Sequence, residues 1–266
     1  MNKASIGRAA HKLAKARRDG SIISLLPPAD RPKTKTEGYA VQKAVHVLLA
    51  AGEHGAIAGY KVGATKPEMQ TYLGVDSPIA GGMYAKGIHP SGMAFRRDDF
   101  IAPGVECEIA LTLGADLPAS GAPYTQRSVA RAVAACHAAV EVADNRYKDF
   151  RAFGTASLVA DDFFHGAFVY GRPVAPKIDL AAAKGHMTIN GKRFGTGSGA
   201  DLMGHPYAVL AWLANHLAET GQPLKAGHII TCGSVTLVGW FKDLPKGEKV
   251  IEVAFAGLGE VRLRFY

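Results

Sequence analysis

Two glutamates, Glu106 and Glu108, lie one residue apart within the apolar run from Ile101 to Leu113. The alternation in this run predicts a β-strand. Glu106 and Glu108 then share one face, with Cα atoms about 6.6 Å apart, and Cys107 faces the other way. Two carboxylates this close repel each other unless one is protonated or a cation lies between them. The pair indicates a site for a hard divalent metal, although solvated glutamates on an edge strand give the same spacing and stay open as an alternative.

Two further residues could take part in chemistry. Lys61 is a single cation in the apolar, glycine-flanked segment Gly59–Gly63, and Asp144 is an isolated acid after the apolar run from Val140 to Ala143. Each also has a simpler interpretation, because a strand lysine can extend to the surface and an aspartate often occupies a turn. The sequence contains no HExxH or GxSxG motif, and no nucleotide-binding fingerprint accompanies the glycines of residues 195–199.

Helices at the amino terminus and strands beyond it must position these residues. Residues 1–18 carry an apolar stripe at helical spacing, and residues 37–51 predict a second helix. From residue 56 short β-like runs alternate with glycines, and residues 229–238 and 250–265 are strand-like. Two more helices are expected, at residues 125–139 and 206–219. The sequence predicts an α+β fold in one continuous domain, with a helical lobe at 1–55 and a β-rich body at 56–266.

Composition excludes several classes of protein. The chain has 266 residues, 48% of them hydrophobic, and a formal charge of +8. Nine Lys or Arg and two Asp fall in residues 1–35, so the body is nearly neutral and we expect the basic segment to be an exposed helix and linker rather than a nucleic-acid surface. Three widely spaced cysteines favour a reducing compartment, with the cytoplasm as the default, and no segment is apolar enough to span a membrane.

Several segments in a fixed order resemble the fumarylacetoacetate hydrolase superfamily, in its hydratase/decarboxylase branch of 2-keto-4-pentenoate (2-hydroxypentadienoate) hydratases. The resemblance begins near Tyr39 and continues to the end of the chain. It rests on segments 59–63 (GYKVG), 73–78 (LGVDSP), 105–110 (VECEIA), 141–146 (EVADNR), 159–162 (VADD), 197–199 (GSG), 204–206 (GHP) and 212–215 (WLAN).

The resemblance implies a fumarylacetoacetate-hydrolase-like mixed β-sheet roll and a metal-dependent site. By similarity, the ligands of Mg²⁺ or Mn²⁺ are Glu106, Glu108 and Asp144. Lys61 and Asp76 are implied as catalytic residues, Lys61 as a proton-transfer group whose pKa a neighbouring metal would lower.

A second set of residues is implied to contact the substrate. These residues are Ser234, Asp161, Arg146 and His165.

The implied activity is hydration of a 2-hydroxydienoate or 2-oxo-enoate to a 4-hydroxy-2-oxo acid, as in the breakdown of aromatic ring-cleavage products. The substrate would chelate the metal through its C1 carboxylate and C2 oxygen, Lys61 would assist ketonisation, and water would add at C4. Decarboxylation of a 2-oxo diacid such as 4-oxalocrotonate is the nearest alternative, with Lys66, Arg146 or Arg151 as a cation for the second carboxylate. Acylpyruvate-type C–C hydrolysis and a non-catalytic partner subunit remain open, and family members are homo-oligomers.

Two segments depart from the family pattern. The family commonly has Val-Ala-Asp-Asn-Ala-Ser-Ser-Gly where this chain has Val-Ala-Asp-Asp-Phe-Phe-His-Gly at 159–166, and Thr-Gly-Ser where it has Cys-Gly-Ser at 232–234. Trp240 also stands where small residues are usual. We expect a pocket that is narrower, more aromatic or directed to another 2-oxo acid.

Overall fold

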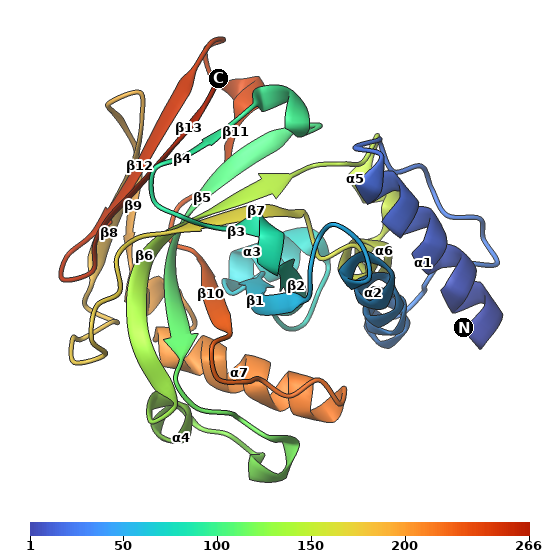
Figure 1. Cartoon of the computed structure of the whole chain (residues 1–266), viewed down its shortest axis with the longest axis horizontal. Helices are drawn as coiled ribbons and strands as arrows, with labels where there is room; N and C mark the ends of the chain where they lie inside the picture. Colours follow the sequence, from blue (N-terminus) through green and yellow to red (C-terminus); the bar gives the residue numbers. More distant parts are fainter.

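The computed structural model describes residues 1–266. The chain forms two β-sheets with helices packed around them (Figure 1). The α-helices are α1 (Lys3–Arg18), α2 (Lys35–Ala50), α3 (Pro67–Leu73), α4 (Gln126–Ala130), α5 (Phe150–Phe153), α6 (Thr155–Ala160) and α7 (Pro206–Glu219). The strands are β1 (Ile57–Gly63), β2 (Ile79–Tyr84), β3 (Ile88–Pro90), β4 (Met93–Phe95), β5 (Pro103–Leu113), β6 (Val133–Asp144), β7 (His165–Tyr170), β8 (Lys184–Ile189), β9 (Lys192–Ser198), β10 (Ile229–Ser234), β11 (Gly239–Trp240), β12 (Lys249–Phe255) and β13 (Gly259–Phe265).

The strands form two mixed sheets. The larger sheet has the order β2-β1-β10-β5-β6-β7-β3, with β11 paired to β5, and the smaller has the order β4-β13-β12-β8-β9. In the larger sheet β1 runs parallel to β10 and β3 parallel to β7, whereas β5 and β6 form a long antiparallel pair. A shared hydrophobic core joins the two sheets and reaches the buried face of α7. The α+β class predicted from the sequence is confirmed.

The two amino-terminal helices begin and end close to the predicted positions. Asn2 caps α1 by accepting a hydrogen bond from the backbone of Ser5, and Thr34 caps α2 in the same way from Glu37. The apolar stripe of α1 is buried, with Leu13 fully inaccessible. None of the helices is both long and apolar enough to cross a membrane.

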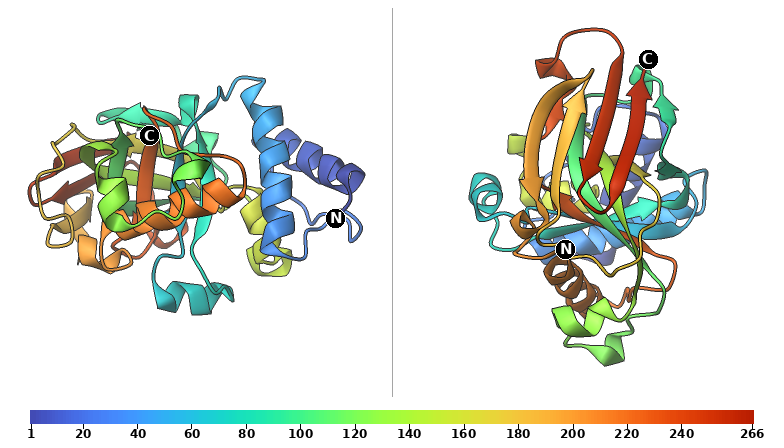
Figure 2. Two further views of the ribbon diagram at one scale, coloured as in Figure 1. Left: turned by 90° about the horizontal axis from the view of Figure 1, so that it is seen from below. Right: turned by 90° about the vertical axis from the view of Figure 1, so that its left-hand side faces the viewer.

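A second hydrophobic core makes the helical lobe larger than residues 1–55. It joins α1 and α2 to α5 and α6, which follow β6 in the sequence. Figure 2 shows these four helices together at one end of the molecule. The expectation that the basic segment is simply exposed is wrong for Arg17, because its side chain is only 7% exposed and contacts Asp162.

The helix expected at residues 125–139 is also wrong. Only Gln126–Ala130 is helical, and β6 begins at Val133. Strand β6 lies between β5 and β7 and is buried on both faces over most of its length, so its run of apolar residues lacks the alternation of a half-exposed strand. A continuous apolar run cannot by itself distinguish a buried helix from a buried strand.

Candidate active site

Three glutamates from two neighbouring strands meet inside the larger sheet. Glu106 and Glu108 lie on β5, and Glu141 on β6 is the direct cross-strand partner of Glu106. One carboxylate oxygen from each lies within 4.8 Å of the others. Glu108 and Glu141 are buried, and Glu106 is partly exposed. The group is therefore open to a ligand from the Glu106 side.

Burial and mutual repulsion disfavour three simultaneous negative charges in this group. Burial and the nearby Glu141 carboxylate raise the pKa of Glu106 to about 7. Burial and the two other carboxylates raise the pKa of Glu108 well above its ordinary value. Burial also opposes ionisation of Glu141, but Lys61 and His165 outweigh it and lower the pKa of Glu141 to about 2.

These residues fit a hard divalent metal ion. Glu108 accepts a hydrogen bond from the backbone N–H of Gly233 through Oε2 (3.0 Å), while its Oε1 atom is buried with no hydrogen-bond partner. An unpartnered buried carboxylate oxygen is costly, and a cation among the three carboxylates would satisfy it. Oxygen-only ligands are those that Mg²⁺, Mn²⁺ and Ca²⁺ prefer.

Lys61 on β1 adds a positive charge beside the carboxylates. Its Nζ atom lies 3.4 Å from Oε1 of Glu141 and 5.0 Å from the ring centroid of Phe163. Burial disfavours the ammonium form, but the three carboxylates outweigh this effect and raise the pKa of Lys61 above its ordinary value. The resemblance implies that a bound metal would lower the pKa of Lys61. This effect would therefore act against the attraction between Lys61 and the carboxylates.

His165 is a buried hydrogen-bond partner of Glu141. The Nδ1 atom of His165 lies 2.9 Å from Oε1 of Glu141, and burial lowers the pKa of His165 and favours the neutral ring. Because the ionised Glu141 can only accept, Nδ1 carries the hydrogen and donates it. His165 is buried and does not line the cavity, so the structure places it behind a candidate ligand rather than against a substrate.

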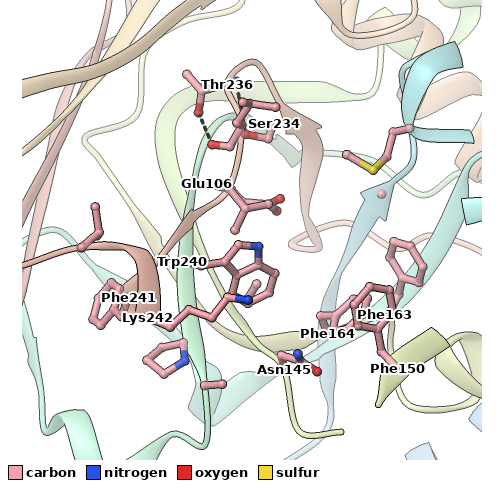
Figure 3. Close-up of a pocket in the computed structure, with 18 of the residues that line it drawn as sticks. Glu106, Asn145, Phe150, Phe163, Phe164, Ser234, Thr236, Trp240, Phe241 and Lys242 are labelled. Atoms are coloured by element: carbon pink, nitrogen blue, oxygen red, sulfur yellow. Dashed lines mark hydrogen bonds between the residues drawn. The ribbon is translucent and has the colours of Figure 1, made fainter. Parts of the chain in front are cut away.

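A cavity of about 1000 Å³ opens above the glutamates. Lys61, Glu106, Ser234 and Asn145 are among the residues that line it. Figure 3 shows Glu106 near the centre of this cavity, with aromatic side chains along its walls. A pocket of this size, lined by hydrophobic side chains together with polar and charged ones, is typical of a small-molecule site.

Asp144, predicted as the third metal ligand, does not join the group. Its carboxylate accepts hydrogen bonds from the backbone N–H groups of Ile101 (3.2 Å) and Ala102 (2.7 Å). Asp144 lies three positions from Glu141, and an odd separation along a strand puts two side chains on opposite faces. We therefore replace Asp144 with Glu141 as the candidate ligand.

Three other predicted site residues lie away from the cavity. Asp76 has a side chain that is 85% exposed and paired with Lys35. Arg146 and Asp161 form a buried ion pair with two hydrogen bonds, of 2.7 and 3.0 Å, behind the site. Arg146 also donates to the backbone carbonyl of His165 (2.7 Å), so the pair supports the segment that carries this histidine.

Glu141 is the residue that the sequence reasoning missed. It is the first residue of the EVADNR segment quoted above and the only acid among the apolar residues 138–143. A lone carboxylate within a buried strand was the available signal. This signal identifies Glu141 only if residues from Val133 onwards form a strand, where a helix was predicted.

The fold and the site define an enzyme of the hydratase/decarboxylase type, with three carboxylates on neighbouring strands of a mixed β-sheet. The chain belongs to the fumarylacetoacetate (FAA) hydrolase family, whose carboxy-terminal domain profile matches residues 84–266. It is 35% identical to a 2-keto-4-pentenoate hydratase of Burkholderia vietnamiensis, over 98% of this chain and 97% of that protein. It is 33% identical to a 2-hydroxyhexa-2,4-dienoate hydratase of Comamonas testosteroni, over 81% and 82%.

Solved structures give the same classification. The 4-oxalocrotonate decarboxylase of Pseudomonas putida G7, complexed with magnesium and adipate, superposes with a TM-score of 0.91 and 29% identity over 100% of this chain and 99% of that one. A fumarylpyruvate hydrolase of Pseudomonas aeruginosa in complex with Mn²⁺ and pyruvate has a TM-score of 0.60 at 16% identity, over 77% and 88%, and shares the fold. Divalent metals thus occur in both of these relatives.

Proposed function

We propose that the protein hydrates a 2-hydroxydienoate or 2-oxo-enoate to a 4-hydroxy-2-oxo acid. The observation that carries this proposal is the group of three carboxylates with Lys61 beside a cavity that Glu106 and Lys61 line. The full-length similarity to two hydratases supports the same substrate class. A 2-oxo acid is small and anionic, so it needs positive charge in the cavity.

Glu106, Glu108 and Glu141 would hold the metal, which we propose to be Mg²⁺ or Mn²⁺. When bound, such an ion supplies Lewis-acid polarisation of the C2 oxygen of a 2-oxo acid. Glu106 is the ligand nearest the cavity, because it alone of the three lines it. His165 fixes the orientation of Glu141 by its hydrogen bond, as partners of metal ligands commonly do.

Other residues that line the cavity would bind the substrate or transfer protons. Lys61 lies within the site with its ammonium directed at the carboxylates, so Nζ is placed to give a proton to, or take one from, the carbon chain of the substrate. Ser234 lines the cavity, and its Oγ accepts from the backbone N–H of Thr236 (3.3 Å) and donates to the carbonyl of Cys107 over a long 3.5 Å. A substrate carboxylate would replace this weak acceptor. The amide of Asn145 is a further polar group on the wall.

Decarboxylation of a 2-oxo diacid is the second candidate. The similarity to the 4-oxalocrotonate decarboxylase favours it, and Lys66 and Arg151 line the cavity. Arg146 is a poor candidate for the distal cation because Asp161 already neutralises it. C–C hydrolysis has weaker support, since the fumarylpyruvate hydrolase shares only the fold at 16% identity.

The assay that separates these activities incubates the Mg²⁺-loaded enzyme with 2-hydroxypenta-2,4-dienoate and with 4-oxalocrotonate. Both CO₂ release and the hydrated product are measured. We expect the hydrated product from the dienoate without CO₂, and its loss in the Lys61→Met variant. CO₂ from the diacid together with an unchanged dienoate would instead establish the decarboxylase.

Assembly and location remain proposals. We propose a homo-oligomer, on the family resemblance described above, and the cytoplasm, on the spacing of the three cysteines. Size-exclusion chromatography with light scattering tests the first of these.

A further inference from the structure

Three consecutive residues at the edge of the cavity have left-handed backbone conformations. Asp162, Phe163 and Phe164 have φ values of 54°, 48° and 67°. Such angles are uncommon for residues other than glycine and strained for bulky side chains, and strained segments cluster at functional sites. The turn lies between α6 and β7, directly before His165.

The side chain of Asp162 stabilises this turn through contacts with other elements. Its buried carboxylate accepts hydrogen bonds from Arg17 of α1 (2.5 Å) and from the backbone N–H of Gly82 on β2 (2.7 Å). Its Oδ1 atom also lies 2.6 Å from Nε2 of His46 on α2. Three elements, α1, α2 and β2, therefore fix the backbone whose next two side chains enter the cavity.

The two phenylalanines form one wall of the cavity. Phe163 packs over Gly63, where a Cβ atom would approach the ring to 2.8 Å. Phe164 makes edge contacts with Phe150 (5.7 Å between ring centroids) and Trp240 (6.3 Å). Figure 3 shows Phe150, Phe163 and Phe164 grouped on one side, with Trp240 on the side of Phe241 and Lys242.

Trp240 brings the aromatic surface next to the carboxylates. It pairs with Gly104 on β5, two residues before Glu106. The indole packs over Gly104, where a Cβ atom would come within 2.7 Å of the ring. Glycines thus leave room for an aromatic ring on both β1 and β5, so the carbon chain of a substrate held at Glu106 would extend between aromatic rings.

Six cations besides Lys61 line the cavity, and four of them, Lys66, Arg97, Arg151 and Lys249, donate hydrogen bonds to uncharged oxygens. Lys66 donates to the carbonyl of Val235 (3.2 Å), and Arg151 donates to the hydroxyl of Tyr72 (2.8 Å). The other two of the six, Lys242 and Lys246, are exposed, and Figure 3 shows Lys242 beside Trp240. The rings of Phe163, Phe164 and Trp240 themselves present apolar surface, so the part of the cavity beside them is better suited to an apolar group than to a second carboxylate.

We infer that Phe163, Phe164 and Trp240 form an apolar subsite, which selects 2-oxo or 2-hydroxydienoic acids with an alkyl or aryl group at the distal end. This inference rests on the proposed function for the position of the 2-oxo acid. Phe163, Phe164 and Trp240 are specificity-determining residues in this assignment.

Calorimetric binding of saturated 2-oxo acids tests the subsite without any turnover. The Mn²⁺-loaded protein is titrated with 2-oxopentanoate, 2-oxo-5-phenylpentanoate and 2-oxohexanedioate. We expect the phenyl compound to bind about tenfold or more tightly than the other two, since one well-packed apolar group contributes at least this much. Phe164→Ala and, independently, Trp240→Ala should each remove most of this preference while 2-oxopentanoate still binds.

The matched control is Phe194→Ala, which removes a half-buried phenylalanine from β9, outside the cavity, and should keep the preference. Equal binding of all three acids, no binding of any, or tightest binding of 2-oxohexanedioate would overturn the inference, the last pointing to Lys242 as a carboxylate partner. A retained phenyl preference without hydration of any dienoate would refute the proposed function alone. Hydration without the preference would refute only the subsite.

Discussion

At the scale of single residues, the main result is that Glu141 rather than Asp144 completes the carboxylate group. Both acids belong to β6, but Glu141 faces Glu106 across the β5–β6 pair while Asp144 binds backbone N–H groups at the strand end. A carboxylate that accepts two backbone hydrogen bonds is already satisfied and has little need of a metal ion. Glu141 has Lys61 and His165 as its partners instead.

Substitutions that remove one charge from each acid distinguish their roles. Glu141→Gln should lower Mn²⁺ affinity and kcat/KM by more than the roughly 10- to 100-fold typical of losing a partner of a metal ligand. Asp144→Asn keeps an oxygen that can accept a hydrogen bond and should change metal affinity less than about threefold. Titration calorimetry with Mn²⁺ and steady-state kinetics measure both effects. The reverse order of the two variants would restore Asp144 as the ligand.

At the scale of elements, α1 is tied to the site by a buried ionic network. Arg17 contacts Asp162 and donates to the carbonyl of His165 (3.2 Å), which also accepts from Arg146. The left-handed turn at residues 162–164 costs of order 1–3 kcal/mol for each strained residue, so contacts from elsewhere must maintain it. The basic amino-terminal segment thus contributes one of its charges to the interior.

Removing that charge should destabilise the protein. Arg17→Met leaves Asp162 buried without one of its cations, and loss of one partner of a buried pair costs about 3–5 kcal/mol of the free energy of unfolding. Arg18→Met, at the exposed neighbour, should change it by less than about 0.5 kcal/mol. Urea unfolding at pH 7 measures both values, and equal effects of the two substitutions would contradict the role of the network.

The difference in the free energy of unfolding between wild type and Arg17→Met should also depend on pH. Burial opposes ionisation of Asp162, but His46, Arg17 and the Gly82 N–H outweigh it and hold its pKa below the ordinary 3.8. A lowered carboxyl pKa contributes stability that is complete above the unfolded-state value and is lost as pH falls through the folded-state value. The gap between wild type and Arg17→Met should therefore be constant from pH 7 to about 5 and shrink below about pH 4.

At the scale of the whole molecule, the candidate metal site lies on β5 and β6, in the centre of the larger sheet. Metal binding should therefore stabilise the entire fold. At a hundredfold excess over Kd, an ion that binds only the folded state adds about 2.7 kcal/mol, which raises the Tm of a chain of this size by roughly 5–10 °C. Thermal unfolding with EDTA and with excess Mg²⁺ or Mn²⁺ measures the shift.

The Glu108→Gln variant is the control for this effect. Its metal-free form should be at least as stable as the wild type, because one of three repelling buried carboxylates is removed. Its metal-induced increase in Tm should be less than half that of the wild type. An undiminished increase would show that the stabilising ion binds elsewhere.

Much of this architecture could be predicted from local patterns. The apolar stripe of residues 1–18 and the patterns of residues 37–51 and 206–219 predicted helices that the structure confirms. Alternation also put Glu106 and Glu108 on one face of a strand. The extent of β6 could not be predicted, because burial on both sides by β5 and β7 removes the alternation that marks a strand.

The sequence by itself determined the α+β class, the family resemblance, Lys61 and the Glu106/Glu108 pair, because these depend on spacing within single segments. Only the tertiary structure showed that Glu141 lies opposite Glu106, that Asp76 is exposed at the surface and that Arg146 pairs with Asp161. It also brought Phe163, Phe164 and Trp240 together around one cavity. The reason is that strand register, burial and ion pairing are set by contacts between segments far apart in the chain, which no local pattern records.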